Sequence, residues 1–262
     1  MASIDVFCDE VAHRGAARLD RLVFALGGVF DSLVDVDTEV DRLDRLADRF
    51  TGNSAMDLLV WMSRSGFRGN SADYYNPDNS MLHRVVRTGF GIPITLSVLA
   101  IEIGRRHDIE LVGIGAPGEF LFRSVDDDSS LYNPFRGKVV DQVEILALLD
   151  ARPLPSGVRA SDLLCPVGPL QIVERMLNNL EQIFQGRRSL VGLERVLRLR
   201  TALPSSSTAA RRRYAAVLEE CGDIGRGLEQ IRRVIDSRDP ADDVLAVRKD
   251  WLLRRRLEAH LN

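Results

Sequence analysis

The chain has 262 residues and a formal net charge of −3, and 45% of its residues are hydrophobic and 28% charged. This composition is typical of a globular protein with a buried core, and it argues against a strongly basic nucleic-acid binder or an acidic disordered tail. No apolar run approaches the ~20 residues of a membrane span, and acidic residues stand near the N-terminus where a signal peptide needs positive charge. We therefore expect a cytoplasmic protein without a membrane partner.

The cysteines and histidines form no metal-binding pattern. Cys8, Cys165 and Cys221 are far apart and make no Cys-x-x-Cys pair. None of the four histidines shares a short motif with another metal ligand, and the glycine-rich segment at 89–92 lacks the lysine of a phosphate-binding loop. We expect no bound metal and no cofactor.

The first 62 residues are predicted to be helical and to pack on the core that follows. Apolar residues recur at helical spacing within 19–26, 40–50 and 56–62. Asp37 or Thr38 is the predicted N-cap of the second of these helices. Residues 1–65 hold twelve acidic residues against seven arginines, which is typical of a solvated acidic surface.

Residues 63–150 are predicted to form an α+β core. A polar loop at 64–80 precedes a short helix, 81–86, for which Asn79 or Ser80 is the expected cap. The segment 93–106 is apolar on nearly every side, so it predicts a buried central helix. Two or three strands, at 110–114, 120–125 and 131–133, and one more short helix, at 143–149, should follow.

Residues 150–168 are rich in Pro, Gly, Ser and Arg and are the expected domain boundary. Beyond them, residues 166–262 are predicted to be helical, with helix pairs at 170–203 and 207–240 and a last helix from 241. Gly186 and Gly222 lie 36 residues apart, as do Pro204 and Pro240. Such a spacing indicates a helical repeat, although two coinciding prolines in an all-helical tail would give the same pattern.

Two arginine runs, 211–213 and 254–256, make the C-terminal region basic, with eighteen basic and thirteen acidic residues in 170–262. A solvated helix face is the simpler interpretation. Alternatively, the runs bind the acidic N-terminal surface or an acidic partner. We do not expect nucleic acid as the partner, because aromatic residues do not alternate with the arginines.

Three sequence blocks together resemble the bacterial SirB-type transglutaminase-like family. They are YYNPDNSMLHRVVRTGFGIPITLS at 74–97, GAPGEFLFR at 115–123 and LYNPFRGK at 131–138. The resemblance covers about residues 35–150, and the tail is similar to the tetratricopeptide-like helices that end many members. It implies an α+β fold: a papain-like core with a small antiparallel sheet, followed by an all-α, helical-repeat-like domain.

The resemblance also implies a Cys-His-Asp triad, but all three positions differ here. They carry Pro93, Glu119 and Asn133. Loss of the nucleophile of a triad lowers turnover by about 10⁶ in a measured protease. No cysteine of this chain falls on the central helix to replace it. Cysteine chemistry is therefore expected to be absent.

Each of these positions also has a simple structural interpretation. Pro93 suits the first turn of a helix, where its missing N–H costs nothing. Glu119 is expected to be exposed or to pair with Arg123 or another arginine. Asn133 before a proline is a normal turn residue.

A groove above the start of the central helix is the candidate binding site. Tyr74, Tyr75 and Asn79 could rim it, although a polar loop folded over the core is the favoured interpretation of this segment. His83 could reach the groove but is interpreted as structural. The candidate groove residues are Tyr75, Asn79, Thr95, Glu119 and Asn133.

The preferred functional prediction is a non-catalytic transglutaminase-like protein that acts as a protein-binding adaptor or regulatory module. A protein or peptide partner would bind through the C-terminal helices. The alternative is an altered enzyme, a hydrolase or acyl transferase, in which Glu119 is the general acid or base and Asn133, Thr95 or Ser97 bind substrate. A purely structural role is the third hypothesis.

Overall fold

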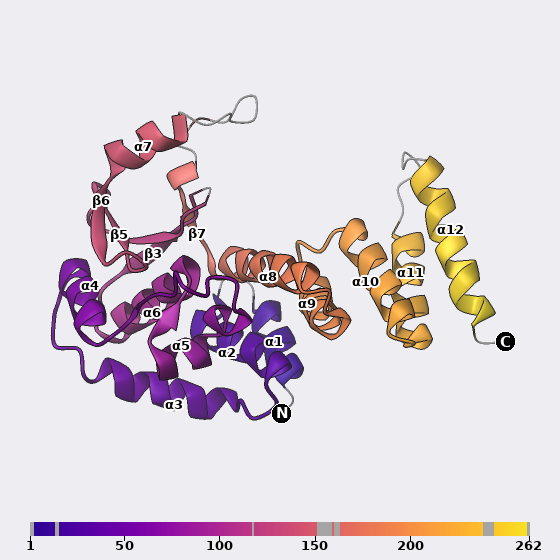
Figure 1. Ribbon diagram of the computed structural model, residues 1–262, viewed down its shortest axis with the longest axis horizontal. Helices are drawn as coiled ribbons and strands as arrows, with labels where there is room; N and C mark the ends of the chain where they lie inside the picture. The colour runs from indigo at the N-terminus through magenta and orange to yellow at the C-terminus, as the bar shows by residue number, and fades with distance from the viewer. Residues whose placement is uncertain are drawn as a thin grey trace. The chain divides into compact units, whose positions relative to one another are not determined.

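The structure is a computed structural model, and it divides into two compact units, Met1–Met176 and Leu177–Asn262 (Figure 1). The division falls inside helix α8 (Pro169–Gly186). Most of the boundary predicted at 150–168 lies outside the described residues, so the domain limits stay a prediction. The residues that the structure describes are 3–13, 16–116, 118–150, 159, 163–237 and 244–260.

The N-terminal part of the first unit is helical, as the sequence predicts. The helices are α1 (Ser3–Ala12), α2 (Leu19–Phe30), α3 (Val36–Ala47), α4 (Ala55–Arg64) and α5 (Leu82–Thr88). The predicted cap of α3 was wrong: the N-cap is Asp35, whose carboxylate accepts a hydrogen bond from the Thr38 N–H at 2.9 Å. Asp37 lies in the first turn and pairs with Arg21 at 2.6 Å.

The central helix α6 spans Pro93–Arg106, as predicted, and most of its side chains are buried. Helices α2, α3, α4 and α5 all contact it. At its C-terminal end the buried carboxylates of Asp20 and Glu102 share Arg106, at 2.8 Å each. Burial and the nearby charge of Asp20 raise the pKa of Glu102. This ion cluster ties α2 to α6.

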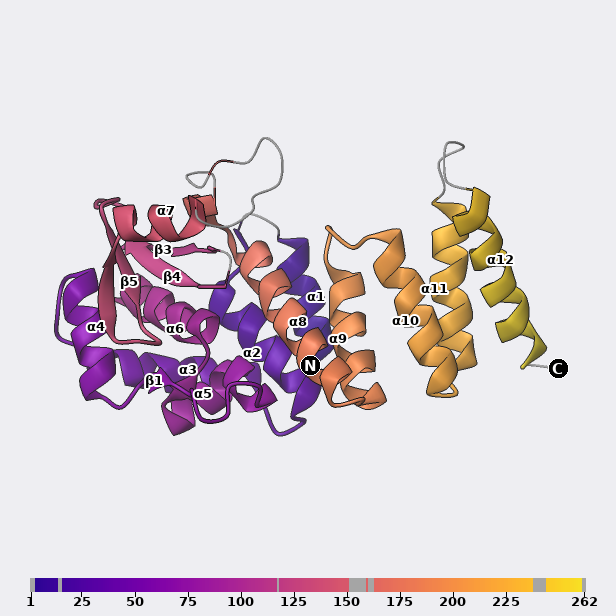
Figure 2. The same ribbon diagram turned by 45° about the horizontal axis from the view of Figure 1, so that its top comes forward.

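A five-stranded antiparallel sheet covers α6, with the order β6-β5-β4-β3-β7. Side chains alternate across it: Leu121 and Leu131 pack toward Ile145 of helix α7 (Gln142–Asp150), whereas Phe122 and Tyr132 stack with ring centroids 5.2 Å apart. Both views show the sheet between α7 and α6 (Figures 1 and 2). The strands are β3 (Leu111–Ile114), β4 (Leu121–Ser124), β5 (Ser130–Asn133), β6 (Lys138–Asp141) and β7 (Pro166–Val167).

A second, two-stranded sheet lies at the start of α6. Its parallel strands are β1 (Arg68–Gly69) and β2 (Phe90–Gly91). Between them in the chain, a single 3-10 turn, η2 (Pro77–Ser80), precedes α5. Because the chain turns here, Met81 and not Asn79 or Ser80 stands at the N-cap of α5, and its side chain makes no cap hydrogen bond.

The second unit consists of helices, in agreement with the prediction of an all-α C-terminal region. Besides the end of α8, they are α9 (Leu190–Ala202), α10 (Thr208–Glu220), α11 (Ile224–Asp236) and α12 (Val244–Ala259). Helix α11 begins 34 residues after α9, and both carry a side-chain N-cap, Ser189 and Asp223. Pro240, one of the predicted repeat markers, lies outside the described residues. Across the part of the chain that the structure describes, no helix has the length and apolar character to cross a membrane.

The arginine run at 211–213 joins helices and is not merely a solvated face. Arg212 pairs with the buried Asp250 of α12, and Arg213 pairs with Glu181 of α8. Arg211 donates to the Gln230 side chain of α11 at 3.3 Å. These pairs hold α10 against its neighbours, so most of this run is not available to an acidic partner.

Candidate functional site

The polar groups at the start of α6 form hydrogen bonds with other residues of the fold. Pro93 is the first residue of the helix and is buried. Two residues further on, the buried Thr95 hydroxyl accepts from the Ile92 N–H at 3.1 Å and donates to the Asn79 carbonyl at 2.6 Å. Thr95 is therefore occupied in holding the helix start against η2.

Asn79 holds the polar loop that precedes it. Its side-chain amide donates to the Asp73 carbonyl at 2.7 Å and the Tyr74 carbonyl at 3.2 Å. Its side-chain oxygen accepts from Asn70 at 3.1 Å. The hydrogen bonds of its side chain are thus made within the loop, and the residue is buried. Asn79 and Thr95 therefore support the start of α6 from within the fold.

Glu119 and Asn133 lie in direct contact. Asn133 ends β5 and is only 2% exposed, and its amide nitrogen lies 3.3 Å from Glu119 Oε2. Arg136 binds Glu119 Oε1 at 2.7 Å, and the Arg136 N–H donates to Asn133 Oδ1 at 3.0 Å. The arginine partner of Glu119 is thus Arg136, in agreement with the expectation of Arg123 or another arginine. These three residues form what we call the Glu119 triplet.

Two contacts place the loop of Glu119 against the helices. On α6, one turn after Pro93, the Ser97 hydroxyl donates to the Phe120 carbonyl at 3.3 Å. From α8, the Arg175 guanidinium donates to the carbonyls of Gly115 and Ala116 at 2.6 and 3.1 Å. The Glu119 triplet is therefore anchored to the helix that begins at Pro93.

Aromatic side chains lie beside the triplet. Tyr74 packs edge-on against Tyr75 and Phe135, with centroid separations of 5.3 and 5.9 Å. Burial and the nearby Tyr75 and Glu119 raise the pKa of the Tyr74 hydroxyl. Tyr75 is 69% exposed, so it offers a surface to a partner.

The cysteines lie on other elements. Cys8 is on α1, Cys165 just before β7, and Cys221 at the C-terminal end of α10, and all three are exposed. Burial, with the charge of Glu194, raises the pKa of the Cys221 thiol, which disfavours the thiolate. Among the residues with described placement, no cluster of three or more potential ligands could hold a metal ion.

His83 is buried away from solvent, between α5 and α2. Its ring lies against Gly27, where an added Cβ would approach Nδ1 to 2.5 Å. Burial, with the charges of Arg84 and Arg87, lowers its pKa to about 4. It is therefore neutral at physiological pH, in keeping with a structural role.

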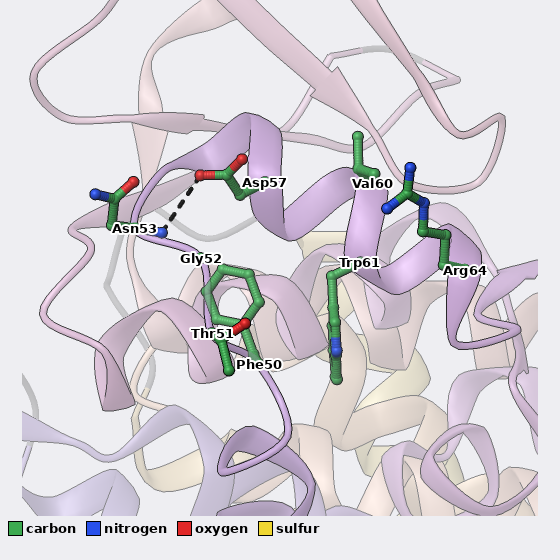
Figure 3. A pocket seen from close by; sticks show the side chains of 8 residues that line it. All are labelled: Phe50, Thr51, Gly52, Asn53, Asp57, Val60, Trp61 and Arg64. Carbon is green, nitrogen blue, oxygen red and sulfur yellow. Dashed lines mark hydrogen bonds between the residues drawn. The ribbon is translucent and has the colours of Figure 1, made fainter.

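A pocket of about 650 Å³ lies elsewhere in the first unit, and the sequence analysis did not single it out. It opens between residues 50–53 and α4 (Figure 3). Phe50 follows the end of α3 and Trp61 lies on α4. Both fall within the apolar segments 40–50 and 56–62 of the sequence, which makes them indistinguishable there from core residues. The lining residues are Phe50, Thr51, Gly52, Asn53, Asp57, Val60, Trp61 and Arg64.

Comparison with known families decides what this scaffold is. Residues 35–178 match the sequence model described as the transglutaminase-like superfamily, over more than half of the chain. The matched segment contains Pro93, Glu119 and Asn133. The chain belongs to the transglutaminase-like superfamily. In this transglutaminase-like chain, the match also includes α3, α4 and the first turns of α8, so it reaches beyond the three sequence blocks.

Several relatives are similar to this transglutaminase-like chain. A UPF0162 protein of Xylella fastidiosa strain Temecula1 is 32% identical over 208 residues, which are 74% of this chain and 72% of the relative. A UPF0162 protein of Pseudomonas aeruginosa is 32% identical over 151 residues, little more than half of each chain at 55% and 56%. The human F-box only protein 21 is 40% identical over 57 residues, 22% of this chain and 9% of that protein. No solved structure matches the chain.

Proposed function

We propose that this transglutaminase-like protein is non-catalytic and acts as a protein-binding adaptor or regulatory module of SirB type. The observation that carries the proposal is the Glu119 triplet, in which Arg136 and Asn133 occupy both oxygens of the Glu119 carboxylate. Both carboxylate oxygens already contact protein side chains, so the group is not left free to take a proton from a substrate. The same pair weighs against the alternative in which Glu119 is a general base.

The start of α6 supports the same conclusion. In a cysteine hydrolase the nucleophile stands where the helix dipole favours a thiolate. Here that position is Pro93, which has no nucleophilic group and is buried. The exposed thiol of Cys221 lies on α10 with a raised pKa, so it is not activated for attack.

The helical second unit supports a role in binding. Helices that recur about every 34 residues form tetratricopeptide-like repeats, whose stacked surfaces bind peptides and proteins. Helix α12 exposes the cations Arg248, Lys249 and Arg255, for which no ion pair with another described residue is found. A partner with an acidic contact surface would complement them.

The proposal is tested by affinity capture with the full-length chain and point variants. Arg248→Glu together with Arg255→Glu reverses the charge of α12, and Arg45→Glu, an exposed residue of α3, is the matched control. We expect a partner bound in stoichiometric amount by the wild type and by the control but lost from the α12 variant. Equal capture by all three proteins, or no stoichiometric partner for any of them, would contradict an adaptor role of this surface.

A further inference from the structure

We propose that the pocket between residues 50–53 and α4 binds a short peptide with free ends and an aromatic side chain. Its volume of about 650 Å³ lies in the range of small-molecule sites. It combines a fixed aromatic surface with one carboxylate and one guanidinium (Figure 3). The pocket is separate from the Glu119 triplet, so the inference goes beyond the proposed function.

The aromatic surface is held rigidly by its neighbours. Trp61 packs edge-on against Phe50, with centroids 5.6 Å apart, and lies 6.1 Å from Phe67. Phe50 in turn packs against His107 at 5.1 Å, and the His107 ring binds the Ala47 carbonyl at 2.9 Å. A ring that is already fixed loses little conformational entropy on binding, and it favours an aromatic or apolar ligand group.

Charged side chains mark the two ends of the pocket. Asp57 and Arg64 are seven residues apart on α4, so they lie on one face of the helix about 10 Å apart along its axis. Asp57 Oδ2 accepts from the Ser54 hydroxyl at 2.7 Å and from the Asn53 N–H at 3.3 Å. Neither Asp57 nor Arg64 forms an ion pair with another described residue, so both charges are open to a ligand.

These positions select the ligand by charge and by length. An extended tripeptide spans about 10 Å at ~3.4 Å per residue, which matches the separation of the two charges. Its ammonium group would bind Asp57, its carboxylate would bind Arg64, and its central side chain would rest on Trp61. Asp57 in the first turn of α4 and Arg64 in its last turn already complement the helix dipole. The charged ends of the ligand would therefore contact these two side chains and not the backbone groups at the ends of the helix.

Gly52 keeps the loop close to the helix. A Cβ at this position would lie 2.5 Å from the Asp57 Cβ and 2.7 Å from the Phe50 ring. A larger residue would therefore move one wall of the pocket. The close approach of loop and helix sets the width of the site.

The experiment uses the fluorescence of Trp61. The chain has two tryptophans, so Trp251→Phe in the full-length protein leaves Trp61 as the single reporter. The probe is the tripeptide Gly-Phe-Gly, with its N-acetylated and C-amidated forms as matched ligands. We expect a saturable change with the free peptide, and binding at least about tenfold weaker when either end is blocked, because each block removes one charge-assisted contact.

Two variants test which end of the peptide binds Arg64 and which end binds Asp57. In Arg64→Gln, the free acid and the C-amide should bind equally, while N-acetylation should still weaken binding. In Asp57→Asn, the pattern should be the reverse. Arg45→Gln, outside the pocket, should behave as the wild type. The inference would be overturned if millimolar peptide gave no saturable change in fluorescence, or if the wild type bound free and blocked peptides equally. Either result would leave the outcome of the partner-capture experiment unaffected.

Discussion

At the scale of single residues, Glu119, which the family resemblance predicts at the position of the histidine, is part of a local structure. The sequence predicted a paired or exposed carboxylate, and the structure supplies Arg136 as the partner. Asn133 donates to one carboxylate oxygen and accepts from the Arg136 backbone. An amide can do both, whereas the family's aspartate can only accept. The side chains of Glu119, Asn133 and Arg136 thus complement one another.

Introducing the aspartate that the family resemblance implies at position 133 should therefore destabilise this protein. Asn133→Asp places a second carboxylate within 3.3 Å of Glu119 Oε2, at a site that is 2% exposed. We expect the free energy of unfolding to fall by about 1–3 kcal/mol at pH 7. Because like charge and burial raise the folded-state pKa of the new carboxyl, the loss should shrink as the pH falls. Urea unfolding at several pH values measures it.

The control is the double variant Glu119→Gln, Asn133→Asp. Its glutamine amide can donate to the new carboxylate, so we expect most of the lost stability to return. An Asn133→Asp protein as stable as the wild type at neutral pH would show that the triplet is not a coupled unit.

At the scale of elements, the helices and strands that follow simple periodicity were predictable. The segment 93–106 is apolar almost all round and opens on a proline, and α6 has those bounds. Strand β6 was missed, because Lys138–Asp141 is short, edge-placed and largely exposed, with little apolar pattern. The predicted N-cap of α3 was wrong because several acidic or hydroxyl residues lie within one turn of the chain. Which of them is the N-cap depends on the backbone geometry, and this geometry selects Asp35.

The candidate site was less predictable than the fold. Alignment with the family named Glu119 and Asn133, but the partner Arg136 depends on how the turn after β5 brings its side chain back. Asn79 and Thr95 were expected to line a groove, but their side chains form hydrogen bonds to backbone carbonyls of the fold itself. A sequence gives the residue types, whereas the direction of each side chain depends on the tertiary packing.

The packing of α5 on α2 gives a pH-dependent prediction. His83 is 1% exposed and has a pKa of about 4 against 6.5 in the unfolded chain. Burial disfavours the charged form of its ring most, and the charges of Arg84 and Arg87 add to this effect against those of Asp31 and Asp78. Between pH 6.5 and 4 the unfolded state binds a proton that the folded state does not. Stability should therefore be full above pH 6.5 and fall by up to about 3 kcal/mol toward pH 4.

The variant His83→Gln should reduce this loss, because the side chain no longer titrates. His13→Gln, at the exposed end of α1, is the matched control and should keep the wild-type slope. Denaturant unfolding between pH 4 and 7 gives the three curves. Identical slopes for wild type and His83→Gln would show that acid acts through other groups.

The arginines of α10 give a second prediction at this scale. Arg212 binds the fully buried Asp250 through two nitrogens. Arg212→Ala leaves that carboxylate without its guanidinium, so we expect a loss of about 3 kcal/mol in urea unfolding. Arg233→Ala, which breaks an exposed pair with Glu229, should lose under about 0.5 kcal/mol.

A double variant separates charge from packing. Arg212→Met with Asp250→Leu removes both charges and should recover most of the stability lost in Arg212→Ala. Arg212→Ala and Arg233→Ala with equal effects would mean that the buried pair does not hold α12.

At the scale of the whole molecule, the transglutaminase-like unit and the helical unit share helix α8. Arg175 of α8 binds the carbonyls of 115–116 in the first unit, while Glu181 of the same helix pairs with Arg200 and Arg213 in the second. The pattern of apolar residues predicted the helices and strands, and the family resemblance added the α+β core with a small antiparallel sheet before an all-α region. The division inside α8 was not predictable, because a continuous helix leaves no compositional mark.

The central claim is that this chain keeps the transglutaminase-like scaffold without its cysteine chemistry. The most direct test measures amide hydrolysis and amine exchange by the purified wild type, by Glu119→Gln and by a variant with serine at positions 8, 165 and 221. The account predicts rates no higher than the uncatalysed reaction for all three proteins. Turnover by the wild type that is lost in either variant would contradict it.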